Sequence, residues 1–362
     1  MGYVLPPVYW RLMNESYHRP EPILAHTGPE VTESTPARAC ATLLIQGERL
    51  LVTDSYGTGV EILEKLRARL KPPADTAPFE QREAFEQAWR ETAIHLLVPI
   101  RGHVVALRNA RNNGFLKQLY PSLPDFYLPL IRVQKLYGAW QLYRTGVHLG
   151  VLGFRIHPFY DTYAPTRVSH LELFATWLSQ YKGAQKTATD VGTGCGVLAF
   201  MLCKAGFTRI LATDSNPNAI ESVTREIDKH KGLHAVTPKH GDLFAGDGRK
   251  NDLIVFNPPW IKGQVDGMLD RALYFEDDLF ERFFDAAYSR LAPSGRVVLL
   301  FSNIMELVQP HEPHPITTEL SRGRFTLVQK LRRKVVPKRD ASGQRRRTKE
   351  RVEVWELAKV QG

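Results

Sequence analysis

A glycine-rich loop between two apolar segments is the feature that most restricts how this chain can fold. The segment before it, residues 187–191, has the character of a buried strand, and residues 197–205 after it have that of an apolar helix. The loop reads Asp190-Val191-Gly192-Thr193-Gly194-Cys195-Gly196. Glycines permit a sharp strand-to-helix turn and let a ligand approach the backbone closely. The pattern therefore predicts a ligand-binding unit of an α/β fold.

Strands and helices alternate around this loop from about residue 147 onward. We predict strands at 187–191, 209–213, 234–240, 253–256 and 296–301, and helices at 171–178, 197–205, 217–230 and 278–291. Near-continuous apolar strands separated by helices favour a doubly wound, mostly parallel sheet. Two more strands, 325–335 and 351–360, predict a C-terminal antiparallel hairpin, and a short hairpin at 147–156 precedes the first of these helices.

Residues 1–145 have a mixed α+β pattern, and we predict that they form an accessory, substrate-recognition domain separate from residues 146–362. Short strands are expected at 41–45 and 49–53, and helices at 60–70 and 83–97. Gly57-Thr58-Gly59 lacks a third glycine and an acid-bearing second strand behind it, so we interpret it as a turn. Three prolines between residues 71 and 78 predict a linker between the two helices.

The glycine spacing indicates the kind of ligand. A dinucleotide loop has the pattern G-x-G-x-x-G and holds a pyrophosphate at the helix N-terminus. Here the pattern is G-x-G-x-G, and Asp190 precedes it by two residues. A carboxylate at that position repels a pyrophosphate but can pair with an ammonium group. A ligand with an amino-acid moiety and an adenosine therefore fits better than NAD.

Acids also follow the next two predicted strands. Asp214 is placed to accept ribose hydroxyls, and Asn216 begins the following helix as its N-cap. Asp242 can accept the exocyclic amine of adenine, with Leu243 or Phe244 beside the ring. Taken singly, Asp214 could be a helix cap and Asp242 a turn residue, but together they mark the strand ends where this fold binds ligands.

The fourth strand leads into Asn257-Pro258-Pro259-Trp260. Two prolines exclude helix and ladder pairing, so the chain leaves the sheet in a fixed extended turn. This turn directs the Asn257 side-chain carbonyl and nearby backbone carbonyls to the ligand crevice, where two acceptors can hold a planar –NH₂ group. Trp260 offers a flat surface for stacking. The alternative is a structural Pro-Pro turn with a core tryptophan.

With these motifs, residues from about 147 to 362 resemble the class I S-adenosylmethionine-dependent methyltransferases. Asn257 to Trp260 resembles the N-P-P-[Y/F/W] signature of the amino-methylating branch. That branch includes the glutamine-N5 protein methyltransferases and the guanine-N2 ribosomal RNA methyltransferases. The segment Tyr163-Ala164-Pro165-Thr166-Arg167 occupies the place of the element that closes over the cofactor in these enzymes, although the second proline of their proline-arginine-proline run is absent.

The resemblance implies S-adenosylmethionine as cofactor, an α/β Rossmann-like sheet and a role for each matching residue. The cofactor residues would be Asp190, Gly192, Thr193, Gly194 and Gly196 for the methionine part, Asp214 and Asn216 for the ribose, Asp242 and Leu243 for the adenine, and Pro165 and Arg167 in the closing element. Asn257 and Pro258 would bind the acceptor nitrogen, beside Pro259 and Trp260. For His157 and His170 near the closing element, we favour packing or capping roles.

The net charge of +10 is concentrated in one segment. Residues 330–351 contain eleven basic and two acidic side chains, a net charge of +9, which leaves +1 for all other residues. The candidate anion-binding residues there are Arg332, Arg333, Lys338, Arg339, Arg345, Arg346 and Arg347. In this fold the turn of the C-terminal hairpin lies on the same rim as the cofactor crevice, so the segment would attract phosphates there. The alternative is a solvated hairpin tip.

Several functions remain open. Within methyl transfer, the acceptor is an exocyclic base amine in RNA, such as ribosomal RNA, or a protein side-chain amide or amine, or a small amine metabolite. Outside it, the chain could be a nucleic-acid-binding protein with a vestigial cofactor site, or an NAD oxidoreductase. The absence of an apolar run of about 20 residues or of a signal sequence argues against membrane insertion and secretion. Cys40, Cys195 and Cys203 lack metal-ligand spacing, so we expect a reduced cytoplasmic protein without a metal site.

Overall fold

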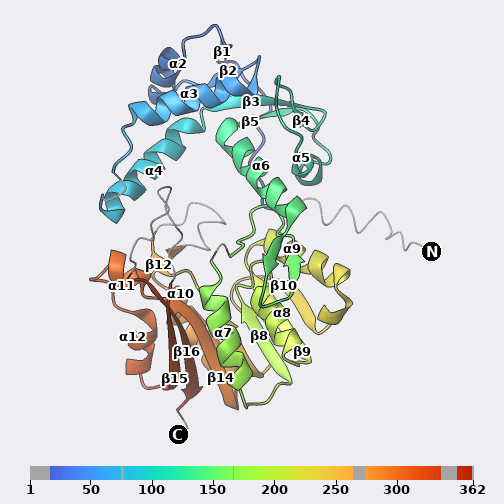
Figure 1. Cartoon of the computed structure of the whole chain (residues 1–362), viewed down its shortest axis with the longest axis vertical. Helices are drawn as coiled ribbons and strands as arrows, with labels where there is room; N and C mark the ends of the chain where they lie inside the picture. The colour runs from blue at the N-terminus through green and yellow to red at the C-terminus, as the bar shows by residue number, and fades with distance from the viewer. Residues whose placement is uncertain (1–16, 75–76, 166, 264–273, 336–348, 361–362) are drawn as a thin grey trace, which may run out of the picture. The chain divides into compact units, whose positions relative to one another are not determined.

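The computed structural model describes residues 17–74, 77–165, 167–263, 274–335 and 349–360, and it divides the chain into two compact units, Met1–Arg144 and Thr145–Gly362 (Figure 1). Among the described residues, no helix has both the length and the apolar composition needed to cross a membrane.

The N-terminal unit contains a five-stranded sheet. Its strands are β1 (Glu30–Val31), β2 (Leu50–Val52), β3 (Leu96–Arg101), β4 (Val104–Val105) and β5 (Phe126–Pro129), and its helices are α2 (Ala37–Ile45), α3 (Tyr56–Arg69), α4 (Phe79–Ala93), α5 (Gly114–Leu119) and α6 (Leu130–Thr145). β1, β2 and β3 are parallel neighbours, while β4 and β5 both pair antiparallel with β3. Gly57 and Gly59 lie in the first turn of α3, which Ser55 caps by accepting the Thr58 N–H.

Residues 57–59 form the start of α3 rather than the predicted turn, and two further predictions for this unit are wrong. Residues 41–45 belong to α2 rather than to a strand, because Cys40, Ala41 and Leu44 form a helical stripe that is buried. The helix predicted at 83–97 ends at Ala93, and β3 begins at Leu96. Leu96 to Ile100 are all buried, so this apolar run is a central strand. Short apolar runs do not distinguish a helix from a buried strand, which explains both errors.

The C-terminal unit is built on a seven-stranded sheet in the order β10-β9-β8-β11-β14-β16-β15. Its strands are β8 (Thr187–Val191), β9 (Arg209–Asp214), β10 (Val236–His240), β11 (Asn251–Phe256), β14 (Leu291–Ser302), β15 (Phe325–Lys334) and β16 (Arg351–Lys359). β16 is antiparallel to both of its neighbours, and the other pairs are parallel. This is the predicted doubly wound sheet with a C-terminal antiparallel hairpin.

Helices cover both faces of this sheet. The helices of the unit are α7 (Ser169–Gln180), α8 (Val197–Lys204), α9 (Pro217–Lys229), α10 (Leu279–Arg290), α11 (Ile304–Val308) and α12 (Pro315–Ser321), with a 3-10 turn at Lys231–Leu233. Successive strand residues face opposite sides: Leu253 and Val255 join the core under α7 and α8, while Ile254 and Phe256 join the core under α10. Both faces are therefore buried, as near-continuous apolar strands require.

Small elements complete the unit around the sheet. The predicted hairpin at 147–156 is present as β6 (Val147–Leu149) and β7 (Phe154–Ile156), which pair antiparallel before α7. A parallel two-stranded sheet of β12 (Ile261–Lys262) and β13 (Tyr274–Phe275) follows β11. The Gln309 side chain fixes β12, because its Oε1 accepts the Lys262 N–H at 3.0 Å and its Nε2 donates to the Lys262 carbonyl at 2.7 Å.

Candidate active site

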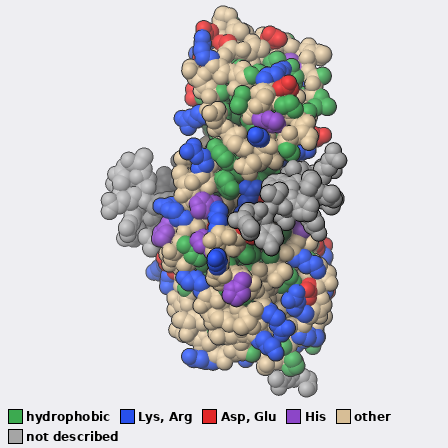
Figure 2. Space-filling view, turned by 90° about the vertical axis from the view of Figure 1, so that its right-hand side faces the viewer, with side chains coloured by type: hydrophobic (Ala, Val, Ile, Leu, Met, Phe, Trp, Pro, Cys, Tyr) green, Lys and Arg blue, Asp and Glu red, His purple; other side chains and the backbone are tan. Residues whose placement is uncertain are grey.

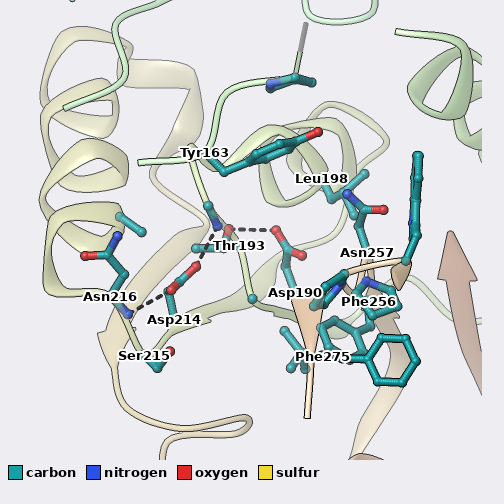
Figure 3. Close-up of a pocket in the computed structure, with 18 of the residues that line it drawn as sticks. Tyr163, Asp190, Thr193, Leu198, Asp214, Ser215, Asn216, Phe256, Asn257 and Phe275 are labelled. Carbon is teal, nitrogen blue, oxygen red and sulfur yellow. Dashed lines mark hydrogen bonds between the residues drawn. The ribbon is translucent and has the colours of Figure 1, made fainter. Parts of the chain in front are cut away.

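A cavity of about 560 Å³ lies at the carboxyl ends of β8, β9 and β11. The loops after these strands supply most of its lining, and Figure 3 shows how the Asp190, Asp214 and Asn257 side chains converge on it. Apart from Gly196, every predicted cofactor residue lines this cavity, and so do the four residues of the Asn257 to Trp260 turn. These lining residues are Pro165, Arg167, Asp190, Gly192, Thr193, Gly194, Asp214, Asn216, Asp242, Leu243, Asn257, Pro258, Pro259 and Trp260. A cavity of this size is typical of cofactor sites.

The glycine loop needs glycine at three positions. Gly192, Gly194 and Gly196 have φ angles of 63°, 55° and 85°, in the left-handed region that favours glycine. A Cβ on Gly196 would lie 2.6 Å from Phe200 Cζ, and Gly196 is the N-cap residue of α8. Gly196 is therefore a structural residue of the loop, which explains why it does not line the cavity itself. The Thr193 N–H donates to the Thr213 carbonyl at 2.8 Å and ties the loop to β9.

Asp190 is fully buried at the end of β8. Its Oδ2 accepts from Thr193 Oγ1 at 2.7 Å and from the Ala199 N–H at 2.9 Å, which attaches the carboxylate to the start of α8. Its Oδ1 is buried and has no hydrogen-bond partner among the described residues. Burial raises the pKa of Asp190 to about 7, against the Thr193 and Ala199 hydrogen bonds. A buried, unpartnered carboxylate oxygen fits a cationic ligand group such as an ammonium.

Asp214 is already part of a hydrogen-bond network at the end of β9. Its Oδ2 accepts the Gly194 N–H and its Oδ1 accepts the Asn216 N–H, both at 2.8 Å (Figure 3). Each carboxylate oxygen keeps a second lone pair for a ribose hydroxyl. Burial raises the pKa of Asp214, while these two N–H groups act in the opposite direction.

Asn216 has a structural role that limits its contact with a ligand. Its Oδ1 accepts the Asn218 N–H and caps α9, and its Nδ2 donates to the Asp161 carbonyl at 2.8 Å. The side-chain oxygen is thus used by the cap, as the helix signal at Asn216-Pro217 predicted. The residue borders the cavity and holds the loop after β9 in place.

In the loop after β10, Leu243 and Phe244 lie in different environments. Leu243 lines the cavity, whereas Phe244 is buried in the core against Phe283. Leu243 has a φ of 46°, an unusual conformation for a residue with a side chain, and its carbonyl accepts from Thr213 Oγ1 at 2.5 Å. Strained backbone of this kind is common at binding sites. Asp242 lines the cavity and forms an ion pair with Arg282 at 2.5 Å.

Asn257 lies at the end of β11, followed by buried Pro258 and Pro259. Its Oδ1 is buried and has no hydrogen-bond partner among the described residues, and the residue lines the cavity. The Trp260 Nε1–H donates to the Leu300 carbonyl at 3.2 Å, which anchors the indole to β14. An unsatisfied buried amide oxygen costs about 1–3 kcal/mol. It therefore marks a place where a ligand N–H is expected.

Tyr163, from the predicted closing element, also lines the cavity. Other lining residues carry no sequence signal that identifies them, and among them are Leu198, Tyr274, Phe275, Glu276, Arg282 and Glu350. Tyr163 lies over the glycine loop in Figure 3. His170 also lines the cavity, edge-on to Trp260 with ring centroids 5.5 Å apart. Burial lowers the pKa of His170 to about 4, so its ring is neutral. His157 does not line the cavity, and its Nδ1 lies 3.2 Å from Glu226 Oε1.

The basic segment is described only in part. Arg332 and Arg333 lie on β15, where Arg332 pairs with Glu353 at 3.2 Å and Arg333 pairs with Glu172 at 2.8 Å. Neither residue lines the cavity. The other predicted anion-binding residues, Lys338, Arg339, Arg345, Arg346 and Arg347, lie outside the described residues. Elsewhere on the face drawn in Figure 2, blue Lys and Arg side chains are scattered over the C-terminal unit.

The hairpin that carries this segment opens at the cavity rim. The Val335 N–H donates to the Glu350 carbonyl at 3.0 Å, and Glu350 lines the cavity. β15 runs parallel to β14 and β11, so its carboxyl end lies at the edge of the sheet that holds the cavity. No cluster of side chains suited to a metal ion is found among the described residues.

The fold and the site define a doubly wound α/β protein with an adenosine-type ligand site at the glycine loop. Residues 171–311 match the family of the Methyltransferase small domain. The C-terminal unit has the class I fold of S-adenosylmethionine-dependent methyltransferases. The cavity fits that cofactor, because Asp190 Oδ1 has no partner among the described residues and suits a cationic group, and Asp214 keeps acceptor lone pairs that suit ribose hydroxyls.

Three relatives are similar to parts of the chain. A Methanocaldococcus jannaschii protein, provisionally named as a protein N5-glutamine methyltransferase, is 27% identical over 146 residues, 38% of this chain and 73% of that protein. The release factor glutamine methyltransferase of Xylella fastidiosa is 36% identical over 80 residues, 22% of this chain and 29% of that protein. The tRNA1(Val) (adenine(37)-N6)-methyltransferase of Cytophaga hutchinsonii is 30% identical over 122 residues, 32% of this chain and 51% of that protein.

Proposed function

We propose that the protein transfers a methyl group from S-adenosylmethionine to an exocyclic base amine in RNA. Asn257 is the main support for a nitrogen acceptor. It lines the cavity, and its buried Oδ1 has no partner among the described residues. An –NH₂ group can donate to that oxygen, which leaves its lone pair to attack an electrophile.

When bound, S-adenosylmethionine supplies an electrophilic methyl group on a positively charged sulfur. Asp190 would bind its ammonium group and Asp214 its ribose, and the glycine loop between them is fixed by hydrogen bonds to both carboxylates. Asn257 and the Pro258 carbonyl orient the acceptor nitrogen, and Trp260 supports its planar group. Positioning of this kind can contribute about 7–11 kcal/mol to catalysis. Acceptor oxygens aimed at the nitrogen stabilise the positive charge that develops there.

RNA is favoured over other acceptors by the basic segment. Six of its arginines and lysines lie between the described strands β15 and β16, which join at the cavity rim. Phosphates are the anions that such a segment binds, with an affinity that falls steeply as salt rises. The Cytophaga relative acts, by its name, on a tRNA adenine. We also assign substrate recognition to residues 1–145. The three free cysteines lead us to propose a cytoplasmic location.

A protein side-chain amide is the second candidate. The Xylella relative acts, by its name, on release factors, and it is 36% identical to this chain over 80 residues. A glutamine amide presents the same –NH₂ geometry to Asn257 as a base amine does.

The experiment that decides between these acceptors uses cells that lack the gene. Their RNA and their total protein are incubated separately with the purified protein and radiolabelled S-adenosylmethionine. We expect label in the RNA fraction, and in ribosomal RNA within it. Label in the protein fraction alone would favour the amide acceptor and contradict RNA as substrate.

A further inference from the structure

The charge balance of the cavity restricts the acceptors that can enter it. Six carboxylate side chains and two guanidinium groups are found among the described lining residues: Asp161, Asp190, Asp214, Asp242, Glu276 and Glu350, with Arg167 and Arg282. Arg282 is paired with Asp242 at 2.5 Å and with Asp278 at 2.8 Å. Arg167 is paired with Glu350 at 2.8 Å. Each lining arginine in the described part of the chain thus has a carboxylate partner.

The pair of Arg167 and Glu350 is asymmetric. The Arg167 side chain is 61% exposed and the Glu350 side chain only 10%. Glu350 is fixed by its surroundings, since its Oε1 lies 3.5 Å from Ser302 Oγ and its backbone carbonyl accepts the Val335 N–H. Arg167 Nη1 donates to Glu350 Oε2, which brings the guanidinium to this fixed carboxylate. The structure therefore places a neutralised arginine, rather than an unpaired one, at Glu350, which precedes β16 and so lies on the side of the cavity beyond β11 and Asn257 in the strand order.

An unpaired arginine at this position would bind phosphate. Its guanidinium presents a planar fork of N–H donors that matches phosphate oxygens. A carboxylate already occupying that fork blocks the contact and repels an incoming anion over the distances found in such a cavity. Glu350 thereby neutralises the more exposed of the two arginines in the described lining, which could otherwise hold a phosphate inside the site.

We propose that Glu350 is a specificity-determining residue that neutralises Arg167, so that the cavity takes a neutral planar acceptor group and rejects acceptors that bring a phosphate into it. This inference rests on the proposed function. A base within RNA satisfies it, because the base enters the cavity while its phosphates remain outside. A small amine metabolite that carries a phosphate close to its amine does not satisfy it, since that phosphate would enter the carboxylate-lined site together with the amine.

The test measures phosphate binding in the absence of any acceptor. Inorganic phosphate is titrated by calorimetry into the full-length protein saturated with S-adenosylhomocysteine. We expect Glu350→Gln to bind phosphate at least about tenfold more tightly than the wild type, because Arg167 loses its carboxylate. The double variant Arg167→Gln/Glu350→Gln should lose this gain, which assigns the new site to Arg167.

Glu172→Gln is the matched control. Glu172 pairs with Arg333 at 2.8 Å, so the substitution makes the same charge change and releases an arginine that does not line the cavity. We expect this variant to bind phosphate as the wild type does. Equal gains in Glu172→Gln and Glu350→Gln would show a general charge effect and overturn the proposal.

A measurement on the wild type covers the case in which Glu350→Gln does not fold. Inorganic phosphate is titrated into the wild type and into Arg167→Gln, both saturated with S-adenosylhomocysteine. We expect equal affinities, and weaker phosphate binding by Arg167→Gln would overturn the proposal, because Arg167 would then bind phosphate in spite of Glu350. The calorimetry uses no acceptor, so a negative result there contradicts only the role of Glu350. A failure to label RNA would instead contradict the proposed function.

Discussion

Asp190 combines two functions at the scale of a single residue. Its Oδ2 holds the start of α8 through Thr193 and Ala199, and its buried Oδ1 remains for a ligand. Burial raises the pKa of Asp190 to about 7, so the carboxyl group holds a proton below that pH. A carboxyl group whose pKa is raised by folding stabilises the protein below its usual pKa, and this contribution is lost as the pH rises through 7.

We predict that the affinity for S-adenosylmethionine increases as the pH rises from 5.5 to 7. A ligand ammonium binds the ionised carboxylate, so below pH 7 binding must first displace the proton, at a cost of up to about tenfold in affinity per pH unit. His170 stays neutral throughout this range, because its pKa is about 4. The measurement is a series of calorimetric titrations.

Asp190→Asn is the control for this pH dependence. The amide has the same shape but does not titrate, so its affinity should be lower and nearly constant across the range. A wild-type profile that is flat over the same interval would contradict the assignment of Asp190 to the ammonium group.

Residues that follow strands could be predicted from the sequence, and residues that reach the site from elsewhere could not. Asp190, Asp214 and Asn257 each stand directly at a strand end, where this fold places ligands, and all three line the cavity. Tyr274 reaches it from strand β13 and Glu350 from the residues just before β16, and no period or motif marks them. The same limit applies to Phe244, whose burial against Phe283 depends on tertiary packing.

The glycine loop is the element on which the site depends. The left-handed φ of 85° at Gly196 and the short distance to Phe200 both exclude a side chain. We predict that Gly196→Ala lowers the free energy of unfolding by more than about 1 kcal/mol, because the left-handed conformation alone costs about 1–2 kcal/mol for a residue with a Cβ. Cofactor affinity should fall as well, since the displaced loop carries Gly194. Thermal and chemical unfolding and calorimetry measure both effects.

Gly232→Ala is the matched control for this prediction. A Cβ on Gly232 would meet no heavy atom within 4 Å. Its unfolding free energy and cofactor affinity should therefore stay close to those of the wild type. If Gly196→Ala behaved like Gly232→Ala, the loop would not have the conformation described here.

Elements of the C-terminal unit were predictable because each carries an unambiguous pattern. β8 and the hairpin of β15 and β16 occur where strands were predicted, and the Asn216-Pro217 signal correctly predicts the start of α9. The N-terminal unit lacks such signals. The run at residues 41–45 is apolar enough for a strand, but α2 forms there because the preceding residues extend its buried stripe.

At the scale of the whole molecule, the main feature is the uneven distribution of charge along the chain. Residues 330–351 hold a net charge of +9, and the described strands on either side join at the cavity rim. We predict that replacing Arg345, Arg346 and Arg347 by Gln weakens binding of the RNA substrate and reduces the slope of log affinity against log salt by about 2, since each lost phosphate contact on a single strand removes about 0.7. Filter binding over a range of salt concentrations measures this slope.

A triple variant at the opposite edge of the sheet controls for net charge. Lys182, Lys186 and Arg209 are exposed and lie at or before the amino ends of β8 and β9. Replacing these three by Gln should leave the salt slope nearly unchanged. Equal slopes in the two triple variants would mean that the basic segment has no special role in RNA binding.

The central claim is that one cavity binds the methyl donor and presents an acceptor nitrogen to it through Asn257. The most direct measurement compares the wild type with Asn257→Ala for S-adenosylmethionine affinity and for methyl transfer to the labelled fraction. We predict dissociation constants within about threefold of each other and a turnover at least about 100-fold lower in the variant, because a preorganised polar group at the reacting centre is lost. A wild type that does not bind S-adenosylmethionine, or a variant that keeps full turnover, would contradict the claim.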